Sequence, residues 1–195
     1  MEKTTIDWPA KYLGRADCNA VNKLLDRTPD YRWQENKFRQ IVYANVHAET
    51  QSIILILYDG IWPDVKIYRR NGWNYFGDQV FAVMKSILFA HYAPGGTIIR
   101  AMLARLPAGA KILRHIDTDP SFAASHRIHV PLRTNQAVEF TVGETLITTE
   151  VGLAFELNNA MPHMVVNAGK TDRVHLIFDY MPKPMGVSDA FKPEL

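Results

Sequence analysis

The chain has 195 residues, a mass of 22.2 kDa and a formal net charge of +2. Hydrophobic residues make up 47% of it and charged residues 22%, as in a globular domain with a proper core, and the small, mixed charge argues against a nucleic-acid surface. The longest apolar run, residues 53–58, is far too short to span a bilayer. One cysteine, Cys18, and an N-terminus without a signal-like apolar run favour a cytoplasmic location.

The N-terminal half of the chain, residues 1–96, is expected to contain helices. Apolar residues at helical spacing predict a short helix within 17–27. The runs 41–46 and 53–58 are strand-like, and the second predicts a buried strand. Asp78 is the expected N-cap of a buried helix over 79–92, which Pro94-Gly95-Gly96 ends.

From residue 97 onward the pattern changes to short strands separated by turns. The expected strands cover 98–106, 111–115, 128–132, 138–142, 145–148, 153–156 and 173–180. Short strands without helical crossovers predict an antiparallel sandwich or jelly roll, so the chain is mainly β with flanking helices. We expect a single domain over 1–195, in which residues 1–96 pack on a β core at 97–182.

Three residues in the β half suggest a metal site. His115 and Asp117 lie two positions apart, so in a strand or its extension they project to the same side. His163, just before a strand-like run, can supply a third ligand from a distant strand. Two imidazoles and a carboxylate on one face of an octahedron form the ligand set of non-haem Fe(II) oxygenases, which leaves open positions. The alternative is that these are ordinary structural histidines, because a His-x-Asp triplet often arises by chance.

Three further residues suggest an anion beside that metal. Arg173 enters a core-like strand, and its planar guanidinium matches the distal carboxylate of 2-oxoglutarate. Alternation places Arg127 and His129 on one face of their strand, where burial would be costly without an anion. The alternatives are a surface arginine beside a turn and an edge strand with a solvated polar face.

Four sequence blocks together resemble the aspartyl/asparaginyl β-hydroxylase family, and in particular its bacterial members that include free-proline hydroxylases. The blocks are His115-x-Asp117, the segment 126–132 (HRIHVPL), the segment 163–167 (HMVVN) and the segment 173–180 (RVHLIFDY). The resemblance covers residues 97–182 well and the N-terminal half weakly. It implies a double-stranded β-helix, which is a cupin-like jelly roll.

The resemblance also implies roles for these residues. His115, Asp117 and His163 would be the iron ligands, Arg173 would bind the distal carboxylate of 2-oxoglutarate, and Arg127 and His129 would contact that cosubstrate near its metal-binding end. The implied reaction is hydroxylation of an unactivated C–H bond with Fe(II), 2-oxoglutarate and O2, which releases succinate and CO2.

Two positions depart from the animal members of the family. Those enzymes lack the carboxylate ligand that this chain keeps at Asp117. Their hydroxyl group that assists the carboxylate-binding arginine should fall near Leu103 or Ala104, and neither residue has one. Both departures put the animal enzymes' substrate in doubt for this chain.

The substrate is expected to be a small molecule or a peptide, amino-acid-like, with no nucleic-acid or membrane partner, and the protein to be a monomer or homodimer. Candidate cations for a substrate carboxylate are Arg100, Arg105 and Arg114. Candidate pocket walls are Trp33, Tyr43, His47, Trp62, Trp73 and Tyr75. Two rival functions stay open: a cupin-like metal-binding protein without turnover, and a metal-free sandwich that binds an anion.

Overall fold

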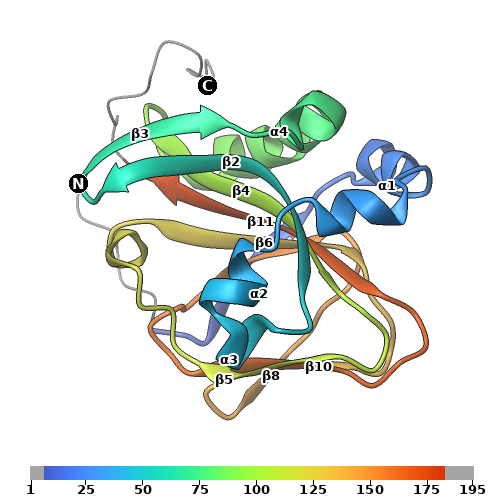
Figure 1. The fold of residues 1–195 in the computed structure, drawn as a ribbon. Helices are drawn as coiled ribbons and strands as arrows, with labels where there is room; N and C mark the ends of the chain where they lie inside the picture. Colours follow the sequence, from blue (N-terminus) through green and yellow to red (C-terminus); the bar gives the residue numbers. More distant parts are fainter. Residues whose placement is uncertain (1–6, 183–195) are drawn as a thin grey trace.

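The computed structural model describes residues 7–182 (Figure 1). The N-terminal half contains β1 (Ala10–Arg15), α1 (Asn19–Leu25), the 3-10 helix η1 (Asp30–Gln34), α2 (Phe38–Val42), α3 (Ala44–His47), β2 (Gln51–Ile61), β3 (Asp64–Arg69) and α4 (Trp73–His91). The C-terminal half contains β4 (Thr97–Leu106), β5 (Lys111–His115), the 3-10 helix η2 (Pro120–Ala123), β6 (His126–Arg133), β7 (Val138–Val142), β8 (Thr145–Ile147), β9 (Leu153–Leu157), β10 (His163–Asn167) and β11 (Arg173–Met181).

The strands form two antiparallel sheets. The larger sheet has the order β1-β9-β6-β11-β4-β2-β3, and the smaller has the order β5-β10-β7-β8. Figure 1 shows α4 lying over the larger sheet, while β5, β8 and β10 form the opposite layer with α3 beside β5. This is the jelly-roll architecture with flanking helices that the sequence predicts.

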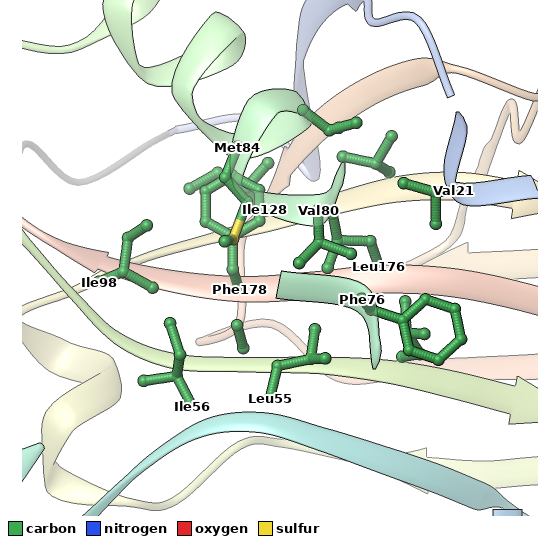
Figure 2. Packing of buried hydrophobic residues seen from close by; sticks show 14 of the residues in the cluster. Val21, Leu55, Ile56, Phe76, Val80, Met84, Ile98, Ile128, Leu176 and Phe178 are labelled. Atoms are coloured by element: carbon green, nitrogen blue, oxygen red, sulfur yellow. The ribbon is translucent and has the colours of Figure 1, made fainter. Parts of the chain in front are cut away.

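The main hydrophobic core lies between the larger sheet and the helices α1 and α4 (Figure 2). Side chains such as Phe76 and Met84 of α4 pack against Leu176 and Phe178 of β11. A second apolar cluster fills the space between the two sheets, with Phe140 and Phe155 among its members. The central strands of the larger sheet, β4, β6 and β11, are therefore buried on both faces.

Alternation along β6 and β11 separates these two spaces. Ile128, Val130, Leu176 and Phe178 belong to the main core. The intervening side chains lie on the other face of the sheet, toward β5 and β10: they are Arg127 and His129 of β6 and Arg173, His175 and Asp179 of β11. The expected division of the segment 126–132 into a polar and an apolar face is confirmed.

The expected strands after residue 97 are confirmed with shifts of at most two residues at their ends. The prediction of a strand over 41–46 is wrong, because the segment forms portions of α2 and α3. Its β-branched residues Ile41 and Val42 are 73% and 53% exposed, so no sheet face buries them and their strand preference has nothing to pack against.

The predicted start of the long helix is also wrong. The helix α4 begins at Trp73, so Asp78 lies in its interior and is not its N-cap. It starts early because Gly72 allows close packing on β2: a Cβ on Gly72 would lie 2.5 Å from the carbonyl oxygen of Ile54. The sequence pattern did not indicate β1 or β3.

Three strands of the N-terminal half join the sheet built by the C-terminal half. The strand β1 pairs with β9, and β2 pairs with both β3 and β4. The division of one domain into residues 1–96 and residues 97–182 stays a prediction. Among the described residues, no helix has the length and apolar character needed to cross a membrane.

Candidate functional site

The three predicted metal ligands lie together between the sheets. His115 ends β5, His163 begins β10, and the two residues face each other in the antiparallel pairing of these strands. Asp117 follows two positions after His115. One ligand atom from each residue lies within 4.8 Å of the other two, and His115 Nε2 is 3.7 Å from Asp117 Oδ1. The spacing suits a single metal ion bound by all three side chains.

Backbone carbonyl groups orient both imidazole rings. His115 Nδ1 lies 2.8 Å from the carbonyl oxygen of Leu113, and His163 Nδ1 lies 3.0 Å from that of Met161. When Nδ1 donates its proton to a carbonyl, Nε2 is left with a lone pair for a metal. Burial lowers the pKa of His163, which favours the neutral, ligating form.

Asp117 is held as a carboxylate. Arg127 Nη1 donates a hydrogen bond of 2.9 Å to its Oδ2. Burial raises the pKa of Asp117, but the charges of Arg127, His163 and His115 outweigh burial, so its pKa lies below the ordinary value. Asp117 therefore offers a negative charge and a free oxygen, Oδ1, on the side of His115.

A buried ion-pair network continues from Arg127. Its Nε and Nη2 donate to the two oxygens of Asp179 at 2.9 and 3.0 Å, in a bidentate pair. Arg100 Nη1 donates to the same carboxylate at 2.9 Å and lies 3.5 Å from Asp119 through Nη2. Since its three nitrogens are already engaged, Arg127 mainly positions Asp117 in this structure.

Arg173 is a buried cation without a buried counter-ion. It is 2% exposed, its Nη2 lies 2.7 Å from His175 Nδ1, and its Nε has no hydrogen-bond partner. Among residues 7–182, no carboxylate forms an ion pair with it. Burial and the nearby charge of Arg39 lower the pKa of Arg173 to about 9, so it is still charged at neutral pH. Such a charge is costly to bury unless an anion binds.

Two neutral imidazoles accompany this arginine. His129 and His175 are buried, their Nδ1 atoms lie 3.4 Å apart, and neither Nε2 has a partner among the described residues. Burial, followed by the charge of Arg173, keeps the pKa of both well below the ordinary value. His129 lines the same cavity as His115, Asp117, His163 and Arg173.

Residues 103 and 104 have no hydroxyl group, and a buried hydroxyl lies beside them on the neighbouring strand. Ser52 of β2 pairs with Ala104 of β4, is 1% exposed, and its Oγ has no partner among the described residues. The polar group next to Arg173 itself is His175. Ser52 and His175 lie on β2 and β11, so the sequence of β4 gives no indication of either.

Sequence reasoning missed one cavity residue and gave another no specific role. Arg39 of α2 and His47 of α3 line the cavity, and Arg39 Nη2 lies 3.1 Å from His47 Nδ1. The His47 ring meets the ring of His115 edge-on at 5.1 Å. The pattern of residues 41–46 indicated a strand, and no periodic signal in it pointed to Arg39.

Two arginine candidates for substrate contacts have acidic partners, although Arg105 also lines the cavity. Arg105 pairs with Asp30 at 2.5 Å, and Arg114 pairs with the exposed Glu144 at 3.2 Å. Trp62 and Trp73 pack against the main core. Of the expected aromatic or histidine walls, His47 lines the cavity.

Comparisons with known proteins identify the family and the fold of the chain. Residues 15–182 match the model of the family described as aspartyl/asparaginyl beta-hydroxylase. No curated protein sequence matches the chain significantly.

Solved structures share the fold at low sequence identity. A 2OG-Fe(II) oxygenase family oxidoreductase from Burkholderia pseudomallei is 14% identical, with a TM-score of 0.53 over 85% of this chain and 78% of that one. A non-haem monooxygenase, solved as a nickel complex, is 14% identical, with a TM-score of 0.53 over 89% and 74%. The viral collagen prolyl hydroxylase of Paramecium Bursaria Chlorella virus-1, solved with 2OG, is 8% identical, with a TM-score of 0.51 over 93% and 100%.

Proposed function

The chain belongs to the aspartyl/asparaginyl β-hydroxylase family, and on that premise we propose that it is an Fe(II)- and 2-oxoglutarate-dependent dioxygenase that hydroxylates an unactivated C–H bond. One observation carries the proposal. A buried arginine without a carboxylate partner among the described residues, Arg173, lines the same cavity as His115, Asp117 and His163. A dianionic, metal-chelating cosubstrate would satisfy both features together.

The donor set of the site fits Fe(II). Two neutral imidazoles and a carboxylate leave open coordination positions on one side, as in non-haem iron oxygenases. The carbonyl groups of Leu113 and Met161 and the guanidinium of Arg127 fix all three ligands from behind. Such outer contacts hold the ligand atoms in place before the metal binds.

The rest of the cavity fits 2-oxoglutarate. Arg173 would bind its distal carboxylate, with Nε free and His175 holding Nη2. His129 has a free Nε2 in the same cavity and would contact the cosubstrate nearer the metal. A direct contact of Arg127 with the cosubstrate stays a prediction, because Asp117 and Asp179 already occupy its nitrogens.

With Fe(II) and 2-oxoglutarate bound, such a site activates O2 to insert one oxygen atom into a C–H bond, releasing succinate and CO2. The chain's own residues supply orientation and a dry cavity. Phe140 and Phe155 close the space around His129 and Arg173, since Phe140 lies 5.7 Å from the His129 ring and 5.6 Å from Arg173 Cζ. Exclusion of water strengthens the hydrogen bonds and ion pairs of the site.

We propose an amino-acid-like substrate, which is either a free, proline-like amino acid or a peptidyl residue. A cytoplasmic location and a monomeric or homodimeric state also stay proposals. The alternative function is a cupin-like protein that binds a metal or an anion without oxygenase turnover.

Succinate release separates these functions. Purified protein would be incubated with Fe(II), 2-oxoglutarate, O2 and a panel of free amino acids and short peptides, and stimulation by one member would identify the substrate class. We expect the double variant Asp117→Ala, His163→Ala to lose both Fe(II) binding and turnover. The matched control Asp78→Ala, His91→Ala changes the same residue types on the exposed surface of α4 and should keep both. Unchanged turnover in the first variant would disprove the site.

A further inference from the structure

We propose that Arg39 binds a carboxylate group of the primary substrate, so that the enzyme acts on a carboxylic acid, with a free α-amino acid as the simplest case. The inference rests on the function proposed above and adds a substrate class and a specificity residue from α2. Its basis is the arrangement of charges in the cavity.

Arg39 lines the metal cavity without an acidic partner. Its Nη2 lies 3.1 Å from a ring nitrogen of His47, and its Nη1 lies 3.6 Å from Met102 Sδ. Among residues 7–182, no carboxylate lies within ion-pair distance of its guanidinium. Arg39 is half-buried, and an imidazole and a thioether do not neutralise a cation, so an anion that binds it would recover part of the free energy of its desolvation.

The other arginines that reach this region have acidic partners. Arg100 pairs with Asp179 at 2.9 Å, and Arg127 pairs with Asp179 and Asp117. Arg105 pairs with Asp30 at 2.5 Å and lies 3.6 Å from Asp172. Of the arginines that line the cavity, Arg39 and Arg173 have no acidic partner among the described residues.

The charges of the cavity leave room for one more anion. Four arginines line the cavity, and two of them, Arg105 and Arg127, have aspartate partners, so the charges of Arg39 and Arg173 remain without one among the described residues. Binding of a divalent metal and of dianionic 2-oxoglutarate does not change this balance. With the distal carboxylate of 2-oxoglutarate on Arg173, the charge of Arg39 is left for the substrate, and one carboxylate neutralises it.

The position of Arg39 separates it from the cosubstrate arginine. Arg39 contacts Met102 of β4, whereas Arg173 of β11 pairs with Leu106, four residues further along the same strand. Four residues of strand span roughly 13 Å. On the side of Arg39, His47 links it to the ring of His115. This spacing is between backbone positions, and the two charges are close enough that, in addition to burial, Arg39 lowers the pKa of Arg173. The contact of His47 with His115 places Arg39 on the side of the metal ligands, where a substrate carboxylate would bind.

Calorimetry on the anaerobic Fe(II) protein tests this assignment. The first titration is with 2-oxoglutarate alone, and the second, on the cosubstrate-loaded protein, uses free L-amino acids and their primary amides. We expect at least one acid to bind the wild-type protein about tenfold to hundredfold more tightly than its amide. Arg39→Gln should remove this difference while leaving 2-oxoglutarate affinity within about twofold, and Arg39→Lys should restore some of it.

Arg32→Gln is the matched control, since Arg32 lies on η1, pairs with Glu35 and does not line the cavity. It should behave like the wild type in both titrations. Loss of 2-oxoglutarate binding in Arg39→Gln would overturn the inference and assign Arg39 to the cosubstrate. Equal binding of acids and amides, or no binding by any acid, would also overturn it. Failure of the wild-type protein to bind 2-oxoglutarate would instead contradict the proposed function.

Discussion

Arg127 and Arg173 enter one cavity from the neighbouring strands β6 and β11, yet their surroundings differ. Arg127 meets two aspartates, whereas Arg173 meets an imidazole and an aromatic ring. The same residue type therefore has two kinds of surroundings: Arg127 orients Asp117, and Arg173 has no acidic partner among the described residues. Loss of the Arg127 charge should therefore lower the stability of the protein, whereas loss of the Arg173 charge should weaken the binding of a ligand.

Substitution Arg173→Met should weaken cosubstrate binding without destabilising the free protein. It removes a buried charge that lacks a carboxylate partner in the described residues, and replacement of such a charge by an apolar side chain is neutral or stabilising. We expect the dissociation constant for 2-oxoglutarate to rise about tenfold to hundredfold, because a charged hydrogen-bond pair is lost. Calorimetry and thermal unfolding measure the two effects, and a large fall in melting temperature with unchanged affinity would refute this interpretation.

The buried histidines predict a loss of stability in acid. Burial keeps the pKa of His129 and His175 well below its ordinary value in the folded protein. The unfolded chain takes up protons on these groups below about pH 6.5 while the folded state does not, so the free energy of unfolding falls as pH is lowered from about 7 to about 5.

Urea unfolding of the metal-free protein at several pH values measures this slope. His175→Asn keeps an acceptor for Arg173 and should reduce the slope by up to about 1.4 kcal/mol per pH unit. His91→Asn, on the exposed end of α4, serves as the control. An unchanged slope in His175→Asn would show that His175 does not stay neutral in the fold.

At the scale of elements, the polar face of β11 joins three strands through charge. Asp179 accepts hydrogen bonds from Arg100 of β4 and Arg127 of β6, and Arg127 continues to Asp117 beyond β5. Asp179 is fully buried, so its negative charge is the counter-ion for both arginines. Sheet pairing sets this arrangement, since Asp179 is the register partner of both Arg100 and Arg127.

Asp179→Asn should therefore destabilise the protein by about 3–5 kcal/mol, because two buried cations lose a shared anion. Glu150→Gln makes the same chemical change in an exposed pair with Arg15 and should cost less than about 1 kcal/mol. Urea unfolding of both variants provides the comparison. Similar losses in the two would mean that the buried network contributes no more than a surface pair.

In the helices α2 and α3, tertiary packing outweighs the local strand propensity of the residues. Ile41, Val42 and Tyr43 favour a strand locally, but in the fold they lie on the surface, while Arg39 and His47 turn inward. Two short helices bring these two residues over the end of β5. The inward residues are polar, and an interpretation based on apolar periodicity gives such residues no inward direction.

At the scale of the whole molecule, the larger sheet separates the residues of the main hydrophobic core from the residues that line the cavity. One face packs on α1 and α4 and forms the main core, as Figure 2 shows, and the other face carries the cavity. Every residue of β11 is buried, but the residues alternate between these two spaces. Substitutions at adjacent positions of one strand should then affect different properties.

Leu176→Ala tests this separation. Leu176 is fully buried in the main core, so its truncation should cost about 2–5 kcal/mol of unfolding free energy. The folded fraction should still bind 2-oxoglutarate with wild-type affinity, since Leu176 faces away from Arg173 and His175. Urea unfolding and calorimetry below the melting temperature measure both. Weaker cosubstrate binding in the folded protein would show that the two faces are coupled.

The sequence by itself determined the strands of the C-terminal half, the two faces of β6 and the pairing of His115 with Asp117. All of these depend on contacts between near neighbours or on the two-residue alternation of a strand. The order of the four motif blocks indicated that His163 and Arg173 belong to the same site. The family match over residues 15–182 includes all four blocks.

The tertiary structure alone decided which charges are free. Strand register places Arg100 and Arg127 beside Asp179, with which both form ion pairs. The same register leaves Arg173 without an acidic partner among the described residues. The helices α2 and α3 brought Arg39 to the cavity from more than sixty positions away along the chain, as its contact with Met102 shows. An arginine's partner depends on distances between segments far apart in sequence, and neither composition nor periodicity encodes those distances.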